Sequence, residues 1–183
     1  MNVLRTSINI LSVFTLLIIG TTVNAQENHL SSSKGESSLG LGVGLPYGGI
    51  GIKIGTNLAD HFNLFGGIGY QIAGVGYNVG FLKDFKSESS TQFYLTGMYG
   101  TNAVILVDGL SEYDKVYTGA TMGLGIKINS RKTEGNFWDV GLLVPIRSSS
   151  FYNNSNEVKN DPRVTEFSDP WPVLITFGYN IHL

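Results

Sequence analysis

The chain contains no cysteine among its 183 residues. This absence excludes a disulfide framework, a thiolate metal site, a cysteine nucleophile and a lipidated N-terminal cysteine. Charged residues are also scarce, at 14% against about 25% in a typical soluble domain. The formal net charge is −2 and no basic block occurs, which argues against nucleic acid as a partner. Glycine, in contrast, is abundant, with 24 residues.

No apolar run reaches the roughly 20 residues that a membrane-spanning helix needs. Residues 8–19 form the longest such stretch, and Arg5 precedes them. Val23 and Ala25 then stand where a signal peptidase prefers small residues. We therefore predict a cleaved secretory signal peptide over residues 1–25. The alternative is an uncleaved membrane anchor, for which the apolar run is short.

Residues 26–37 are polar and predict a flexible lead-in, followed by one domain over residues 38–183. In that domain apolar residues recur at every second position, which is the period of a strand, and no 3.6-residue helical period is present. The alternating positions fall into eight groups, at residues 39–45, 50–56, 62–72, 75–81, 93–103, 120–128, 138–144 and 173–183. Eight alternating strands of roughly 9–11 residues, secretion and few charges predict an all-β, up-and-down antiparallel transmembrane β-barrel of eight strands.

Each expected strand has one branched or aromatic face and one face of glycine and small polar residues. Ile50 and Ile52, for example, alternate with Gly51 and Lys53. If the isoleucines faced inward, Lys53 and Lys127 would face lipid, at roughly 2–4 kcal/mol each near the bilayer midplane. We therefore predict that the glycine face lines a narrow lumen. The rival, a soluble barrel of lipocalin type, would present a glycine surface with few charges to water.

Aromatic residues on the outward faces gather near the strand ends. Five lie on the side of the termini and two toward the other side: Phe62, Phe81, Phe93, Trp138 and Tyr179, then Tyr70 and Tyr99. Two such belts are typical of the two interfaces of a bilayer. Aromatic residues also favour strands in general, which is the alternative explanation.

The last strand reads "FGYNIHL", in which Phe177, Tyr179 and Ile181 alternate and Leu183 stands where a terminal aromatic residue is usual. With the signal peptide and the eight strands, these residues resemble small bacterial outer-membrane β-barrels of the OmpA/OmpX-type general build. The glycine-dense style is similar to small barrels of Bacteroidetes-type outer membranes. The resemblance covers residues 38–183 and implies an outer-membrane location with both termini in the periplasm. It also implies contact with outer-membrane lipid and lipopolysaccharide, and with the barrel-insertion machinery through the last strand.

This orientation assigns the turns to two sides. The segments "NLADH", "KDFKSESS" and "SRKTEG" become periplasmic turns. The outer side then carries "PYGG", a tight turn near Ala73, a loop at residues 108–115 and a long polar loop at residues 147–171. Two of these four connections are short, so only half of the outer rim is expected to project.

Three inward-facing charges, Lys53, Lys127 and Asp139, form a candidate cluster inside the barrel. The turn near Lys132 places Lys127 opposite Asp139, which predicts a cross-strand ion pair between them, with Lys53 as a possible third member. A buried charge without a partner is costly. One interpretation is that the cluster holds the interior together, and the other is a charged constriction in a pore.

No catalytic residue, metal ligand set or cofactor is expected from the sequence. His29, His61 and His182 all fall on the side of the termini, away from the outer rim where lipid-modifying barrels act. No nucleophile-elbow motif occurs, and the glycine-rich "GLGVG" lacks the helix that a phosphate loop needs.

The long outer loop contains three acidic candidates, Asp161, Glu166 and Asp169. Carboxylates of this kind bind Ca²⁺ or the cation layer of lipopolysaccharide, and the alternative is a solvated loop or a contact surface for an unknown extracellular partner. The leading hypothesis is thus a non-enzymatic outer-membrane barrel with a structural or surface-interaction role through its outer loops. A narrow pore or transporter for small solutes is the first alternative, and a lipid-modifying enzyme at the rim is the second.

Overall fold

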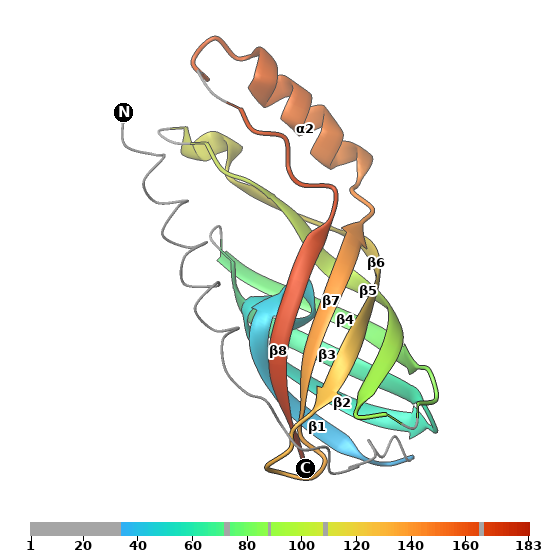
Figure 1. The fold of residues 1–183 in the computed structure, drawn as a ribbon. Helices are drawn as coiled ribbons and strands as arrows, with labels where there is room; N and C mark the ends of the chain where they lie inside the picture. The colour runs from blue at the N-terminus through green and yellow to red at the C-terminus, as the bar shows by residue number, and fades with distance from the viewer. Residues whose placement is uncertain (1–33, 72–73, 88, 108–109, 165–166) are drawn as a thin grey trace.

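The structure, a computed structural model, describes residues 34–183 except 72–73, 88, 108–109 and 165–166. Every strand pairs antiparallel with its neighbours along the chain, and the first also pairs with the last, which closes the sheet into a barrel (Figure 1). The strands are β1 (Ser37–Gly44), β2 (Gly49–Ala59), β3 (Phe62–Gln71), β4 (Gly74–Asp84), β5 (Thr91–Ile105), β6 (Lys115–Asn129), β7 (Phe137–Pro145) and β8 (Leu174–His182). The predicted eight-stranded antiparallel barrel is confirmed. The predicted signal peptide and residues 26–33 lie outside the described residues.

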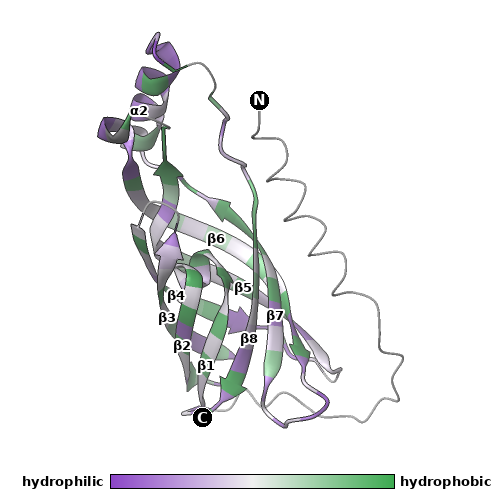
Figure 2. Cartoon of the chain, turned by 90° about the vertical axis from the view of Figure 1, so that its left-hand side faces the viewer, coloured by the Kyte–Doolittle hydropathy of each residue, from purple (hydrophilic) through white to green (hydrophobic). Residues whose placement is uncertain are grey.

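Side chains alternate between the two sides of the barrel wall, as the period of a strand requires. On β2 the exposed fraction is 68% for Ile50 and 42% for Ile52, whereas Lys53 is only 4% exposed. On β6 it is 59% for Leu124 and 6% for Lys127. The predicted register, with isoleucines outward and lysines inward, is therefore confirmed. Figure 2 shows the resulting alternation of hydrophobic and hydrophilic positions along the strands.

The β5–β6 hairpin extends well beyond the rest of the barrel (Figure 1). Both strands have 15 residues, longer than the 9–11 predicted for a single crossing. The register shifts between Thr101 and Ala103 of β5, where an irregularity of the bulge type interrupts the pairing with β6. Such irregularities bend a strand, so the hairpin leaves the barrel wall at this point.

A helix, α2 (Ser149–Asn160), lies beyond the same end of the barrel (Figure 1). The prediction of a long polar loop without a helix at residues 147–171 was therefore wrong. The Ser148 side chain caps the helix by accepting a hydrogen bond from the backbone N–H of Phe151. The helix escaped detection because its apolar face consists of Phe151 and Val158 alone, among serine and asparagine residues of modest helix propensity. Among the described residues, no helix is long and apolar enough to span a membrane.

The helix and the hairpin tip share a small hydrophobic core. We call this unit the cap and define it as α2, residues 103–107 and 110–117, and residues 161–164 and 167. Its buried members are Ile105, Tyr117, Phe151 and Val158. The rings of Tyr117 and Phe151 meet edge to face with centroids 5.3 Å apart, and Asn154 Nδ2 donates a 2.7 Å hydrogen bond to the Tyr117 hydroxyl. The cap is therefore a packed structure at one end of the barrel.

We expect Phe151→Ala to unfold the cap while leaving the barrel intact. Truncating a buried phenylalanine costs about 3–5 kcal/mol. Because the cap core has only four buried apolar side chains, we expect this loss to exceed what the remaining three can stabilise. Limited proteolysis with mass-spectrometric mapping of the cuts should show rapid cleavage confined to the cap. Asn153→Ala, which truncates an exposed side chain on the same helix, is the control and should cleave as slowly as the wild type. Equal cleavage of the two variants would contradict the packing described here.

Candidate functional site

The connection between β1 and β2 folds back into the barrel. It forms a short 3-10 helix, η1 (Leu45–Tyr47), in which all three residues are buried. Positive φ angles of 123° at Gly44, 69° at Gly48 and 110° at Gly49 let the chain reverse direction on both sides of η1, which glycine allows without steric cost. We call residues 45–47 the plug. The prediction that placed "PYGG" among the connections of the outer rim did not foresee this inward fold of residues 45–47.

Glycines on the inner face of the wall make room for the plug. A Cβ added to Gly42 of β1 would lie 2.7 Å from the Tyr47 ring, and one added to Gly178 of β8 would collide with the Tyr47 hydroxyl. A Cβ on Gly67 of β3 would collide with the carbonyl oxygen of Pro46. Since real Cβ atoms do not approach other heavy atoms so closely, these positions need glycine while the plug is in place. The glycine face thus lines the lumen, as predicted, and also accommodates the inserted turn.

The tip of the plug joins the interior charges. The Tyr47 hydroxyl donates a 2.8 Å hydrogen bond to Oδ2 of Asp139 on β7. The same oxygen is ion-paired with Lys53 of β2 and accepts a 3.0 Å hydrogen bond from Asn180 Nδ2 of β8. Lys53 Nζ also lies 4.7 Å from the centroid of the Tyr47 ring, within cation–π range. The plug is thus tied to three separate strands.

A second ion pair lies in the lumen. Lys127 Nζ is 2.7 Å from Oδ2 of Asp84, both side chains are buried, and the Phe137 ring centroid is 5.1 Å from the ammonium. Lys127 and Asp139 face each other in the β6–β7 register, as expected. However, the ion pair predicted between them is not formed, because Asp139 pairs with Lys53 and Lys127 pairs with Asp84. Sequence reasoning missed Asp84 because it had been assigned to a periplasmic turn, whereas β4 continues through it.

Large apolar side chains fill the part of the lumen that the plug leaves free. They form one buried cluster with Leu45 of the plug: Phe65, Leu82, Tyr94, Met98 and Leu143. Tyr94 in turn lies over the neighbouring strands β6 and β7, where a Cβ on Gly125 or Gly141 would come within 2.5–2.6 Å of its hydroxyl. Because Tyr47 and Leu143 are both 0% exposed, the described residues pack the centre of the lumen tightly.

Two of the three acidic candidates of the outer loop, Asp161 and Asp169, are paired with cations. Asp161 accepts hydrogen bonds from Arg163, at 2.6 Å to Nη2, and from the Tyr113 hydroxyl, at 2.7 Å, and Arg163 also contacts Glu112. The Arg163 guanidinium holds the pKa of Asp161 well below its usual range. Asp169 lies apart, 2.6 Å from Lys159 Nζ. These interactions connect α2, the segment after it and the hairpin tip.

Glu166, the third acidic candidate, lies outside the described residues. Within the part of the chain that the structure describes, no three histidine, aspartate or glutamate side chains gather in a way that would hold a metal ion. His61 lies in the β2–β3 turn and His182 ends β8, so both lie at the end of the barrel away from the cap. The geometry therefore presents two features for function: a lumen closed by the plug, and the cap.

No family model matches this sequence, and neither does any curated protein. Among solved structures, the N-terminal β-barrel domain of Pseudomonas aeruginosa OprF matches over 81% of this chain and 98% of that chain. The identity is 15% and the TM-score is 0.46. The fold of this chain is established by its own closed strand pairing and not by this match.

We expect Tyr47→Phe to destabilise the barrel by about 1–3 kcal/mol, since it removes a buried donor to Asp139. Guanidinium unfolding, followed by tryptophan fluorescence, gives the free energy of unfolding. Tyr99→Phe removes the hydroxyl of an outward-facing tyrosine on β5 and should change the free energy of unfolding by less than about 0.5 kcal/mol. A plug that contributes nothing would leave both variants at the wild-type value.

The buried Lys53–Asp139 pair should behave as a unit. Asp139→Asn leaves the Lys53 charge buried without its carboxylate, and we expect a loss of about 3–5 kcal/mol. Adding Lys53→Met to that variant should recover more than half of the loss, because the unpaired charge is then gone. The exposed Lys159–Asp169 pair of the cap, treated with the same two substitutions, should change stability by at most about 1 kcal/mol. Simple additivity of the two barrel substitutions would refute the pairing.

Proposed function

We propose that this chain is an integral β-barrel protein of a bacterial outer membrane. The observation that carries the proposal is a band of exposed apolar side chains that encircles the closed barrel. Every strand contributes to it, for example Leu41, Ile50, Ile68, Val79, Tyr99, Leu124, Leu142 and Ile175. Monomeric soluble proteins rarely expose apolar patches larger than a few hundred Å². In a bilayer the same band is solvated by hydrocarbon, and the closed sheet leaves no unpaired edge.

The distribution of charge supports the same proposal. Lys53, Lys127, Asp84 and Asp139 are buried inside the barrel, where they pair with one another. Of the described strand residues, the charged side chains that are exposed lie near strand ends, as Lys83 of β4 does. A lysine at this height extends its ammonium to the headgroup region.

Aromatic side chains mark one edge of the apolar band. On the side of the termini, Trp138 stacks on Phe177 with ring centroids 5.1 Å apart and also contacts Tyr179 at 4.7 Å. Phe62 and Phe81 also stack on each other on this side, in the β3–β4 pair. Aromatic residues concentrate at the interface of a bilayer, which supports a girdle at this level.

We place the termini in the periplasm and the cap outside the cell. Ser38 of β1 pairs with His182 of β8, so the two ends of the barrel chain lie on one side, and the cap lies on the other. This orientation follows the general build of small outer-membrane barrels. In it β8 is the segment presented to the insertion machinery, and lipopolysaccharide surrounds the cap end.

We propose a non-enzymatic role in which the cap is the surface that contacts other molecules. The plug and the packed side chains argue against the alternative of a pore, because Tyr47 and Leu143 are fully buried among the residues that the structure describes. The exposed side of α2 offers Tyr152, Asn153, Asn156 and Glu157, a mostly polar set with one aromatic ring that is suited to contact with another molecule. The cap is held rigid by its own core and by the Arg163 interactions.

The outer-membrane location is tested by cell fractionation and gel mobility. We expect the chain to stay in outer membranes after an alkaline carbonate wash and to migrate differently on gels when unboiled and boiled, as folded barrels do. Leu124→Lys places a charge in mid-wall at roughly 2–4 kcal/mol and should reduce the folded, heat-modifiable fraction. Asn153→Lys on the exposed side of α2 is the control and should not. Extraction of the wild type by carbonate would contradict the proposal.

A further inference from the structure

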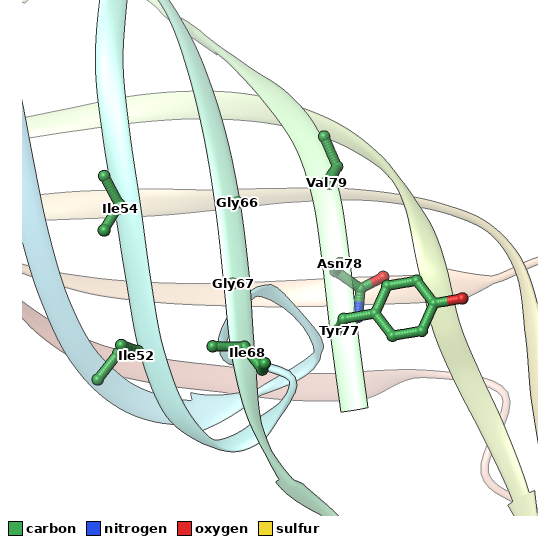
Figure 3. A pocket seen from close by; sticks show the side chains of 8 residues that line it. All are labelled: Ile52, Ile54, Gly66, Gly67, Ile68, Tyr77, Asn78 and Val79. Carbon is green, nitrogen blue, oxygen red and sulfur yellow. The ribbon is translucent and has the colours of Figure 1, made fainter. Parts of the chain in front are cut away.

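The outer wall has an apolar groove between β2 and β4 (Figure 3). Its volume is about 230 Å³, and its lining is almost wholly apolar: Ile52, Ile54, Gly66, Gly67, Ile68, Tyr77, Asn78 and Val79. The groove exists because Gly66 occupies an outward position in the middle of β3, between Ile54 and Val79 in the register. Figure 3 shows this bare stretch of β3 between the side chains of its two neighbours.

An outward glycine does not by itself leave a groove in this wall. Gly97 of β5 also faces outward, but the Phe81 ring covers it, and a Cβ there would lie 2.8 Å from that ring. Around Gly66, in contrast, nothing lies within 4 Å of an added Cβ. The wall therefore covers one outward glycine and leaves the other open.

A track of outward side chains leads from the groove to a lysine. Along β4, Val79 is followed by Phe81 and then by Lys83, and the Phe81 ring stacks on Phe62 with centroids 5.8 Å apart. Four residues of strand separate Lys83 from Val79 by about 13 Å. Lys83 is exposed and has no ion-pair partner among the described residues.

We propose that this groove binds one acyl chain of a phospholipid whose phosphate lies at Lys83. The inference rests on the proposed membrane location, since the groove is continuous with the apolar band that hydrocarbon would solvate. A cavity of this size is smaller than the roughly 300–1,000 Å³ of ordinary ligand pockets and suits a single thin chain.

Charge complementarity selects the phospholipid and its leaflet. The cation beside the track, Lys83, lies at the end of β4 on the side of the termini, where a headgroup of the inner leaflet would lie. The cap-side ends of β2, β3 and β4 contain no lysine or arginine to hold the phosphates of a lipid A. The site is thus built for an anionic or zwitterionic phospholipid of the leaflet at the termini.

Native mass spectrometry of the detergent-solubilised barrel, titrated with palmitoyl-oleoyl-phosphatidylglycerol, tests the proposal. We expect one tightly retained lipid per chain. Gly66→Leu, which fills the groove without a clash, should weaken this binding about tenfold or more because several methylenes lose their contact. Ala120→Leu introduces a leucine at an exposed position on β6 and should leave the lipid affinity unchanged. Lys83→Gln should weaken it about fivefold, and Lys115→Gln in the cap should have no effect.

Three results would overturn the site: a Gly66→Leu affinity equal to that of the wild type, an equal loss in Ala120→Leu, or a dimer abolished by Gly66→Leu in place of a lost lipid. The last result would assign the groove to a second copy of the chain. Failure of the membrane proposal gives a different signature, because the wild type would then remain monodisperse without detergent. Equal heat modifiability of all four variants shows that each is folded.

Discussion

A closed ring of eight strands encloses a fixed, narrow volume, and the rest of this structure depends on how that volume is filled. The plug fills one part of the lumen, and side chains of the wall fill the rest. On β1, β2, β3 and β8 the inner positions include glycines such as Gly42, Gly67 and Gly178, and the plug occupies the space beside them. Elsewhere the wall's own side chains, such as Tyr94 and Leu143, fill the lumen, and glycines such as Gly125 and Gly141 make room for them. The inward glycines are therefore the counterpart of the inserted turn and of these large side chains.

The interior charges stabilise this arrangement because they connect elements that are distant in the sequence. Asp139 brings together Tyr47 of the plug, Lys53 and Asn180, and it thereby joins the plug to β2, β7 and β8. The second pair, between Lys127 and Asp84, joins β6 to β4. Two lysines and two aspartates leave no net charge in the lumen, which limits the cost of burying them.

Much of the fold could be predicted because a strand alternates strictly between two environments. Lys53 and Lys127 settled which face is inward, since the opposite register would have placed both in the apolar band. The inward fold of the plug could not be predicted, because proline, tyrosine and glycine suit an outward turn equally well. The same limit applies to α2, whose apolar face has only two members, and to Asp84, whose role depends on a lysine 43 residues away.

The central claim is that hydrocarbon contacts the outer wall all the way around while the polar groups stay inside. Because the chain has no cysteine, single cysteines can be introduced on β2, β4, β6 and β8, at Ile50, Val79, Leu124 and Ile175. Spin labels at these four positions, in protein reconstituted into lipid vesicles, report contact with lipid or water through relaxation by oxygen or by a water-soluble nickel complex. The account predicts strong relaxation by oxygen and protection from nickel at all four positions. Nickel accessibility at these positions equal to that of a label on the exposed side of α2 would contradict it.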